Sequence, residues 1–369
     1  MPTTRIHSSA GTYEVHYARG ALARARSRIG RLDDVTGLFV LSSPRVWRLW
    51  KRSASRALGV NPHRAILFDD RESAKRQASV ERVARTLTRA GADRRCILVA
   101  VGGGVVGDVA GFAAATYLRG VRLVHLPTTL VAQVDSAIGG KTGVDLPEGK
   151  NLVGSFYPPK LVLADPDFLR TLPHREYRSG LYEVVKYGII NDAKLFEVLE
   201  ARMDALLRRD PAALDWIIPR CIAIKARVVN EDERESGARK ILNFGHTLGH
   251  AFEAATSYQR FLHGEAIAWG MMATTLIGLA VGRTNEADAI RIFRLIARVG
   301  TLPALKGISV ANLQKIVASD KKNRAGQARW VLARAIGEAE WDVEIPWPVA
   351  ARAFANLPGI AAKATACPK

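Results

Sequence analysis

Cysteines are scarce in this sequence of 369 residues, and so are long hydrophobic runs. The three cysteines, Cys96, Cys221 and Cys367, lie far apart, which excludes a disulfide framework and a thiolate metal cage. We expect all three to be reduced and structural. No apolar run approaches the roughly 20 residues of a membrane span, and the first residues lack a hydrophobic signal segment. We therefore expect a soluble, cytoplasmic protein with no membrane partner.

Acidic residues are also few, because 35 Asp and Glu face 54 Lys and Arg, a net charge of +19. Clustered cations would indicate nucleic-acid binding, since they neutralise phosphates and release counterions. Here the basic residues are spread along helical faces such as 45–56, with no zinc finger, RNA-binding aromatic motif or basic repeat. We expect no nucleic-acid partner, but a solvated basic surface and a small anionic substrate.

Three of the eight histidines gather near one another, at His246, His250 and His263. The first two are four residues apart, so on a helix they share one face, and the third follows in a turn bounded by glycine. A single histidine usually caps or packs, but three together favour a divalent metal. Catalytic zinc commonly has three ligands from His, Glu and Asp and one open position. Glu183 is the candidate carboxylate; its alternative is a surface ion pair with Lys186.

The first half of the chain alternates apolar runs with helical stretches. Strands are predicted at 13–17, 37–41, 65–68, 96–101 and 123–126, and helices after Gly20, from about Val46, over 80–90 and from about Val106. This alternation predicts a parallel sheet covered on both faces. After Pro173 long helical periodicity continues until a strand near Trp330. The sequence therefore predicts an α/β Rossmann-like domain of residues 1–175 and a mainly α-helical domain of residues 176–369.

Glycines and isolated charges mark two candidate anion sites in the first domain. The loop 102–108, Gly-Gly-Gly-Val-Val-Gly-Asp, follows a predicted strand and opens a helix. Such glycines let the backbone approach a pyrophosphate at a helix N-terminus, although a tight turn needs glycine anyway. The segment 127–151 combines Asp135, Lys141 and Lys150 with several glycines and few other charges, which favours anion binding.

Together these motifs resemble the 3-dehydroquinate synthase family of the sugar phosphate cyclase superfamily. The matching segments run in order from about residue 72 to 322, and include 102–108, 127–129, 135–141, 149–151, 183–186 and 243–250. The resemblance implies a phosphate-eliminating lyase of the shikimate pathway, which supplies aromatic amino acids. Its reaction converts 3-deoxy-D-arabino-heptulosonate 7-phosphate to 3-dehydroquinate and phosphate by transient oxidation, phosphate elimination, reduction and intramolecular aldol closure. It further implies NAD, Zn²⁺ (with Co²⁺ as an alternative), a homodimer, and an active site between the two domains.

The resemblance also assigns roles to individual residues. The metal ligands would be Glu183, His246 and His263. The NAD contacts would be Glu72, Lys75, Gly103, Gly104, Val105, Val106, Gly107, Asp108, Thr128, Thr129, Lys141, Lys150, Phe168, Leu169 and Thr171. Substrate contacts would be Arg119, Asp135, Lys141, Asn151, Lys186, Lys225, Arg239, Asn243, His250 and one of Lys321 and Lys322.

Two questions remain open at this stage. The segment 42–44, Ser-Ser-Pro, stands where the family usually has an Asp or Asn that holds adenosine, so the choice of NAD over NADP is open. Related cyclases that make deoxyinosose or valiolone rings share the motifs, while zinc polyol dehydrogenases share the architecture but release a ketone and NADH. Lys225 and Arg239 favour the heptulosonate, because a guanidinium with a nearby ammonium suits its carboxylate.

Overall fold

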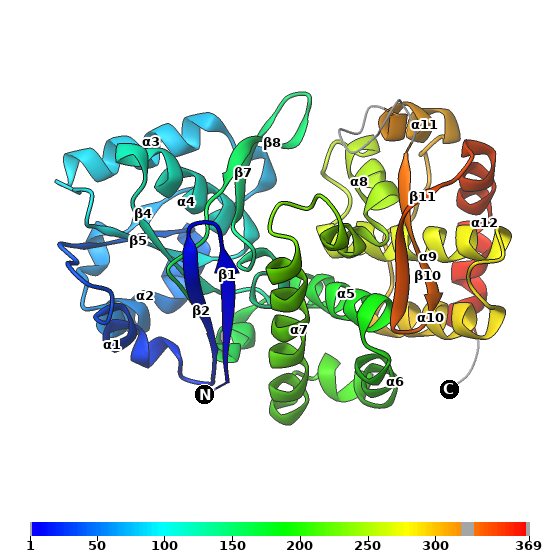
Figure 1. Cartoon of the computed structure of the whole chain (residues 1–369), viewed down its shortest axis with the longest axis horizontal. Coiled ribbons are helices and arrows are strands. Elements are labelled where there is room, and N and C mark those ends of the chain that lie inside the picture. The colour runs from blue at the N-terminus through cyan, green and yellow to red at the C-terminus, as the bar shows by residue number, and fades with distance from the viewer. Residues whose placement is uncertain (1, 319–327, 367–369) are drawn as a thin grey trace. The chain divides into compact units, whose positions relative to one another are not determined.

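The computed structural model describes residues 2–318 and 328–366 of the chain (Figure 1). It divides into two compact units, one comprising Met1–Pro173 and Leu214–Arg234, and the other His174–Ala213 and Glu235–Lys369. The first unit thus includes a segment, 214–234, that the sequence had assigned to the second domain. No helix in the described part of the chain is long and apolar enough to cross a membrane.

The first unit is built on a seven-stranded sheet with the order β1-β2-β9-β6-β5-β3-β4. Only β1 and β2 pair antiparallel; the remaining neighbours pair parallel. The strands are β1 (Thr3–Ser8), β2 (Gly11–Tyr17), β3 (Leu38–Ser42), β4 (Ile66–Leu67), β5 (Ile97–Gly102), β6 (Arg122–Pro127) and β9 (Leu161–Ala164). The predicted strands correspond to β2, β3, β4, β5 and β6, so the parallel α/β architecture is confirmed.

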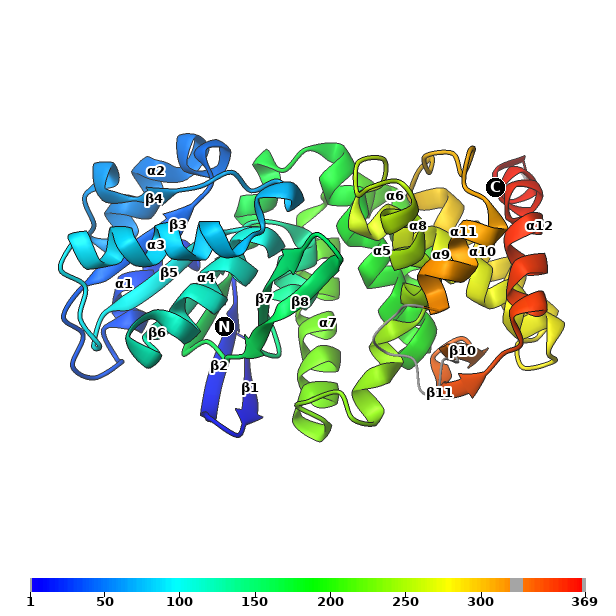
Figure 2. The same ribbon diagram turned by 90° about the horizontal axis from the view of Figure 1, so that it is seen from above.

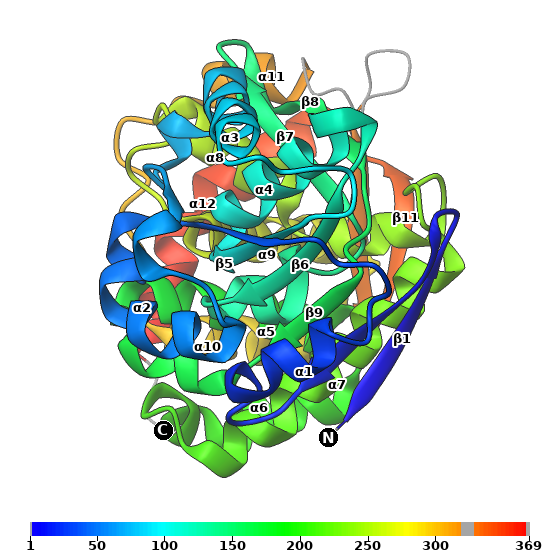
Figure 3. The same ribbon diagram turned by 90° about the vertical axis from the view of Figure 1, so that its left-hand side faces the viewer.

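Alternating side chains of β5 supply both cores of this unit, because successive residues of a strand point to opposite faces. Leu98 and Ala100 join a cluster with helices α3 (Gln77–Arg89) and α4 (Gly104–Thr116). Ile97, Val99 and Val101 join a second cluster with α1 (Ala25–Ile29) and α2 (Pro44–Leu58). Figure 3 shows these helix pairs on opposite faces of the sheet.

A separate hairpin of β7 (Lys141–Leu146) and β8 (Gly149–Phe156) packs on α4. The approach is close, since a Cβ on Gly111 of α4 would lie 2.2 Å from Cγ2 of Thr142. Sequence analysis treated this stretch as a glycine-rich anion-binding segment and did not predict the hairpin.

Long-range hydrogen bonds explain why 214–234 belongs to the first unit. Most of this segment is helix α7 (Pro211–Glu231), from Leu214 to its end. The hydroxyl of Tyr17 donates to Oδ1 of Asp215 over 2.6 Å, and the backbone amide of His7 donates to Oδ1 of Asn230 over 2.8 Å. These bonds attach α7 to the β1–β2 hairpin, and no local sequence pattern could reveal them.

The second unit is mainly helical, as the sequence predicts. Its helices are α5 (His174–Asn191), α6 (Ala193–Leu207), α8 (His246–Ala255), α9 (His263–Ala280), α10 (Glu286–Val299), α11 (Val310–Ala318) and α12 (Trp347–Ala366). The predicted strand near Trp330 is β10 (Arg329–Ala335), which pairs antiparallel with β11 (Glu338–Glu344). Helix α9 lies against α5, α8, α10 and α12, and Figure 2 shows α12 beside α9, α10 and α11.

Candidate active site

Glu183, His246 and His263 come together in the second unit, from helices α5, α8 and α9. One ligand atom from each lies within 4.8 Å of the others. Oε1 of Glu183 is 4.0 Å from Nε2 of His246 and 3.5 Å from Nε2 of His263. The side chain of Glu183 is fully buried, at 0 % exposure. Sequence reasoning placed His263 in a turn, whereas it is the first residue of α9.

Glycines bring the histidine-bearing helices close together. A Cβ on Gly270 of α9 would lie 1.9 Å from the carbonyl oxygen of Gly245, the residue before His246. Likewise a Cβ on Gly264 would lie 1.9 Å from the carbonyl oxygen of Ser179 on α5. Since neither position tolerates a side chain, the backbones of α5, α8 and α9 meet where the three ligands project.

The group fits a divalent ion. Two ligands about 2.1 Å from a tetrahedral zinc ion are themselves roughly 3.4 Å apart, close to the spacing of Glu183 and His263. Oε1 of Glu183 is buried and accepts no hydrogen bond from the described residues. Nδ1 of His246 faces the carbonyl oxygen of Phe244 at 3.1 Å, so the ring donates from Nδ1 and keeps Nε2 available as a ligand.

The ammonium of Lys186 lies against the other carboxylate oxygen of Glu183, Oε2. Its Nζ lies 2.5 Å from Oε2 of Glu183, and the lysine side chain is 1 % exposed. The two residues are three apart on α5, so the predicted pair exists, but it is buried and not on the surface. Glu183 therefore faces an ammonium with one oxygen and two imidazoles with the other.

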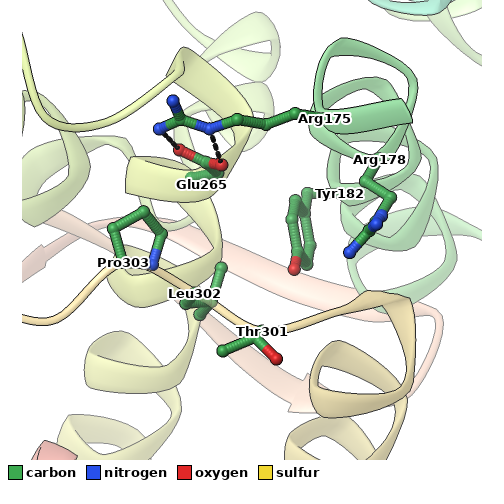
Figure 4. Close-up of a pocket in the computed structure, with 7 residues that line it drawn as sticks. All are labelled: Arg175, Arg178, Tyr182, Glu265, Thr301, Leu302 and Pro303. Atoms are coloured by element: carbon green, nitrogen blue, oxygen red, sulfur yellow. Dashed lines mark hydrogen bonds and ion pairs between the residues drawn. The ribbon is translucent and has the colours of Figure 1, made fainter. Parts of the chain in front are cut away.

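A salt bridge holds the first turn of α9 against α5 (Figure 4). The guanidinium of Arg175 binds both carboxylate oxygens of Glu265, with Nε and Nη2 each at 2.7 Å. Glu265 in turn accepts from the backbone amide of Leu262 over 2.8 Å, which caps the helix that begins at His263. A cavity of about 370 Å³ lies beside this pair, and none of the residues predicted from the sequence lines it.

Three further predicted substrate contacts belong to the second unit. Arg239 lies on the short helix η7 (Ala238–Asn243) and is 1 % exposed. Asn243 ends that helix, and its amide donates to the carboxylate of Glu235. The ring centroid of His250 lies 5.2 Å from that of His246 and 5.9 Å from that of His263. Lys321 and Lys322 lie outside the described residues.

In the first unit the glycine loop forms the predicted strand-to-helix turn. β5 ends at Gly102, Gly103 precedes the first turn, and no described side chain caps the N-terminus of α4. A Cβ on Gly103 would lie 2.8 Å from Cγ2 of Thr129, so this glycine allows the loop after β6 to approach. The turn leaves a helix N-terminus with backbone amides and no side-chain anion, which suits a phosphate group.

Four of the charged residues predicted to contact NAD form one network around Lys75: Glu72, Lys75, Asp108 and Lys150. Nζ of Lys75, which is 3 % exposed, lies 2.6 Å from Oδ2 of Asp108 and donates to the amide oxygen of Asn151. Lys150 pairs with Oε1 of Glu72 over 3.2 Å. Burial alone would lower the pKa of Lys75, but the carboxylates of Asp108 and Glu72 outweigh it and raise that pKa. The ammonium therefore stays charged although it is buried.

Lys225 has a partner that the sequence did not predict. On α7, its ammonium lies within hydrogen-bonding distance of Oδ1 of Asp135, which belongs to the π-helical turn η5 (Ala132–Ser136). Both residues are in the first unit, whereas sequence analysis grouped Lys225 with Arg239. The buried lysine is thus paired with a carboxylate.

The remaining predicted cofactor contacts, and the predicted substrate contact Arg119, differ in how exposed their side chains are. The side chains of Phe168 and Leu169 are buried, and Phe168 packs edge-on against Trp50. The hydroxyl of Thr171 accepts a hydrogen bond from Nε1 of Trp50 over 2.9 Å, and Thr128 is buried. Lys141, at the start of β7, and Arg119 are exposed.

Ser42, the last residue of β3, and Ser43, which follows it, make hydrogen bonds within the fold. The hydroxyl of Ser42 donates to the carbonyl oxygen of Val101 over 2.7 Å, and that of Ser43 accepts from the amide of Val46 at the start of α2. Both serines are fully buried, so these hydroxyls are engaged within the first unit.

Sequence reasoning missed several polar residues that surround the predicted ones. Glu253 lies 3.5 Å from His263, Glu235 accepts a hydrogen bond from Asn243, and Asp145 accepts one from the backbone amide of Asn151. A signal existed for Glu253, because it stands three residues after His250 and seven after His246, on the same face of α8. The other two contacts, Glu235 with Asn243 and Asp145 of β7 with Asn151 of β8, join residues that no helical spacing places together.

Comparison with known proteins agrees with this description. Residues 65–179 match the family described as 3-dehydroquinate synthase N-terminal, and residues 180–323 match 3-dehydroquinate synthase C-terminal. The chain is 44% identical over 348 residues to the 3-dehydroquinate synthase of Koribacter versatilis (strain Ellin345), covering 94% of this chain and 95% of that protein.

Two solved structures are similar over nearly the whole chain. The 2-epi-5-epi-valiolone synthase of Streptomyces hygroscopicus subsp. jinggangensis 5008, with NAD⁺ and Zn²⁺ bound, has a TM-score of 0.85 at 28% identity, covering 94% of this chain and 97% of that one. A 2-deoxy-scyllo-inosose synthase, complexed with carbaglucose-6-phosphate, NAD⁺ and Co²⁺, has a TM-score of 0.84 at 28% identity, covering 95% and 99%.

The fold is therefore that of the sugar phosphate cyclases. Within that class the family matches and the identity over almost the full length decide the assignment. The chain belongs to the 3-dehydroquinate synthase family.

Proposed function

We propose that this chain converts 3-deoxy-D-arabino-heptulosonate 7-phosphate to 3-dehydroquinate and phosphate. The observation that carries the proposal is the group of Glu183, His246 and His263, whose ligand atoms lie within 4.8 Å of one another, with Glu183 buried, in a member of this family. The role in the shikimate pathway follows from this activity.

The proposal includes two cofactors. Glu183, His246 and His263 would hold Zn²⁺ or Co²⁺, which when bound supplies positive charge that lowers the pKa of a substrate hydroxyl. The glycine turn at 102–108 and the network around Lys75 would hold NAD, which when bound accepts and returns a hydride, so turnover consumes none of it. This assignment is supported by the two cyclases solved with NAD⁺ and Zn²⁺ or Co²⁺.

The chain's own residues would orient a flexible anion and balance its charge. The buried cations Lys186 and Arg239 suit the phosphate and carboxylate of the substrate, because charge-assisted hydrogen bonds are strongest where water is excluded. His250 would contact the phosphate. Cations outnumber acid–base groups among these residues, which agrees with catalysis mainly by positioning and electrostatic stabilisation.

The direct test is phosphate release from the heptulosonate phosphate with NAD and Zn²⁺ present. We expect phosphate to accumulate over many turnovers. The NADH concentration, measured by its absorbance, should stay at or below the enzyme concentration. A sample without NAD serves as the control. Steady accumulation of NADH would contradict the proposal and favour a polyol dehydrogenase.

A second candidate is a related cyclase acting on a neutral sugar phosphate. The TM-scores of 0.85 and 0.84 to the valiolone and deoxyinosose synthases favour it. The lower identity to those two chains, 28% against 44% to the 3-dehydroquinate synthase, argues against it. Turnover of a substrate without a carboxylate separates the two candidates.

We also propose a homodimer in which Arg119 contacts the site of the other copy. Leu118 and Arg119 both have left-handed backbone angles, with φ of 49° and 66°, which non-glycine residues rarely adopt. Such strain persists where the surrounding structure enforces it, often for function. The turn presents an exposed guanidinium, which suits an anion held by a second copy of the chain.

A further inference from the structure

His263 lies between two buried carboxylates. Its Nε2 is 3.5 Å from Oε1 of Glu183, and its Nδ1 is 3.5 Å from Oε2 of Glu253. Glu253 is 2 % exposed and shares one face of α8 with His246 and His250. Each ring nitrogen of His263 therefore faces a different carboxylate.

The geometry points to Glu253 as a positioning residue for the metal ligand His263. A carboxylate that faces Nδ1 favours the tautomer with its proton there, which leaves the lone pair of Nε2 for the ion. His246 obtains the same tautomer from a neutral acceptor, the carbonyl oxygen of Phe244. This inference rests on the proposed metal site and adds the group that orients its third ligand.

Glu253 also changes the charge of the site. Without an ion, the buried carboxylates of Glu183 and Glu253 outnumber the ammonium of Lys186 by one. With a divalent ion bound, these groups carry one net positive charge. Without Glu253 they would carry two net positive charges. Because isolated charge is costly to bury, Glu253 strengthens ion binding through its charge as well as through the orientation of the ring.

A different arrangement is also geometrically feasible. His250, Glu253 and His263 form a second group whose ligand atoms lie within 4.8 Å of one another. If the ion bound there, Glu253 would be a ligand, and Glu183 would be dispensable for binding. The two arrangements make opposite predictions for the two carboxylates.

The test measures Zn²⁺ affinity of the metal-free chain by competition with a chromophoric chelator. We expect Glu253→Gln, which keeps the shape but removes the charge, to weaken binding about tenfold, and Glu253→Leu about a hundredfold. Glu183→Gln should weaken binding far more than either. Glu286→Gln on α10 is the matched control, since Glu286 is exposed and its loss changes the net charge equally.

Nitrogen NMR of the zinc-loaded chain supplies a readout that a merely structural role would not move. We expect the proton of His263 to be on Nδ1 in the unsubstituted chain and to exchange faster with water in Glu253→Leu. Equal affinities in Glu253→Gln, Glu253→Leu and Glu286→Gln would overturn this inference alone and leave the proposed function intact. Retention of Zn²⁺ by Glu183→Gln with loss in Glu253→Gln would overturn it in favour of the second group. A chain that binds no Zn²⁺ would overturn this inference and the proposed metal site together.

Discussion

Replacing Gly270 with alanine should separate the helices that carry the histidines. The new Cβ would lie 1.9 Å from the carbonyl oxygen of Gly245 and 2.9 Å from the amide nitrogen of Gly249, both backbone atoms of α8 or its N-cap. Ordinary contact begins at 3.4 Å, so the two backbones must part by about 1.5 Å. Overpacking of this kind costs roughly 1 to 3 kcal/mol of unfolding free energy.

The same displacement moves His246 relative to His263. Functional groups must stay within about 0.5 Å of their working geometry, so we expect Gly270→Ala to weaken Zn²⁺ binding at least about tenfold. Urea unfolding of the metal-free chain and a Zn²⁺ titration measure the two effects. The control is Gly359→Ala on α12, an exposed position where a Cβ would meet nothing within 4 Å. If both variants unfolded alike and bound Zn²⁺ equally, the close approach of α8 and α9 would not be what assembles the site.

Three further predictions concern acid stability, the metal and assembly. Burial lowers the pKa of His125 in the folded chain to about 4. Between about pH 6.5 and 4 the imidazole is therefore protonated in the unfolded chain but not in the folded chain. The free energy of unfolding should therefore fall by about 2 kcal/mol from pH 7.5 to 5, a loss that urea titrations should find absent in His125→Leu. Removal of the metal with a chelator should abolish phosphate release, and added Zn²⁺ should restore it. His246→Ala should lose the metal, whereas His250→Ala should keep the metal and release phosphate more slowly. Full activity of a metal-free preparation would contradict the metal assignment. Mixing Arg119→Ala with His246→Ala should restore part of the activity if copies exchange, and no recovery despite verified exchange would count against a shared site.

Local patterns were sufficient to predict much of the first unit. Runs such as 97–101 are apolar on both faces, as a central parallel strand requires, and the glycine loop after it marks the turn into α4. The strands β1 and β9 and the β7–β8 hairpin escaped prediction. The hairpin sequence is rich in glycine and charge, and its strands form by pairing with each other and packing on α4, which no local period encodes.

The candidate site likewise contains features that the sequence could predict and contacts that it could not. His246 and His250 were recognisable because four-residue spacing on a helix places two rings on one face. The pairing of Lys225 with Asp135 was not, since it joins residues 90 apart in sequence. It depends on α7 returning to the first unit. A contact between distant segments leaves no local pattern in the sequence, so this pair could be found only in the structure.

The most direct test of the account is substrate choice. Arg239 is buried, at 1 % exposure, and a guanidinium there suits the carboxylate that sedoheptulose 7-phosphate lacks. Losing the charge-assisted hydrogen bonds between that guanidinium and the carboxylate should cost on the order of 3 to 5 kcal/mol, or several hundredfold in kcat/KM. We expect phosphate release from the heptulosonate phosphate to exceed that from sedoheptulose 7-phosphate by this factor, and Arg239→Met to narrow the gap mainly by slowing the former. Comparable turnover of both substrates by the unsubstituted chain would contradict the account.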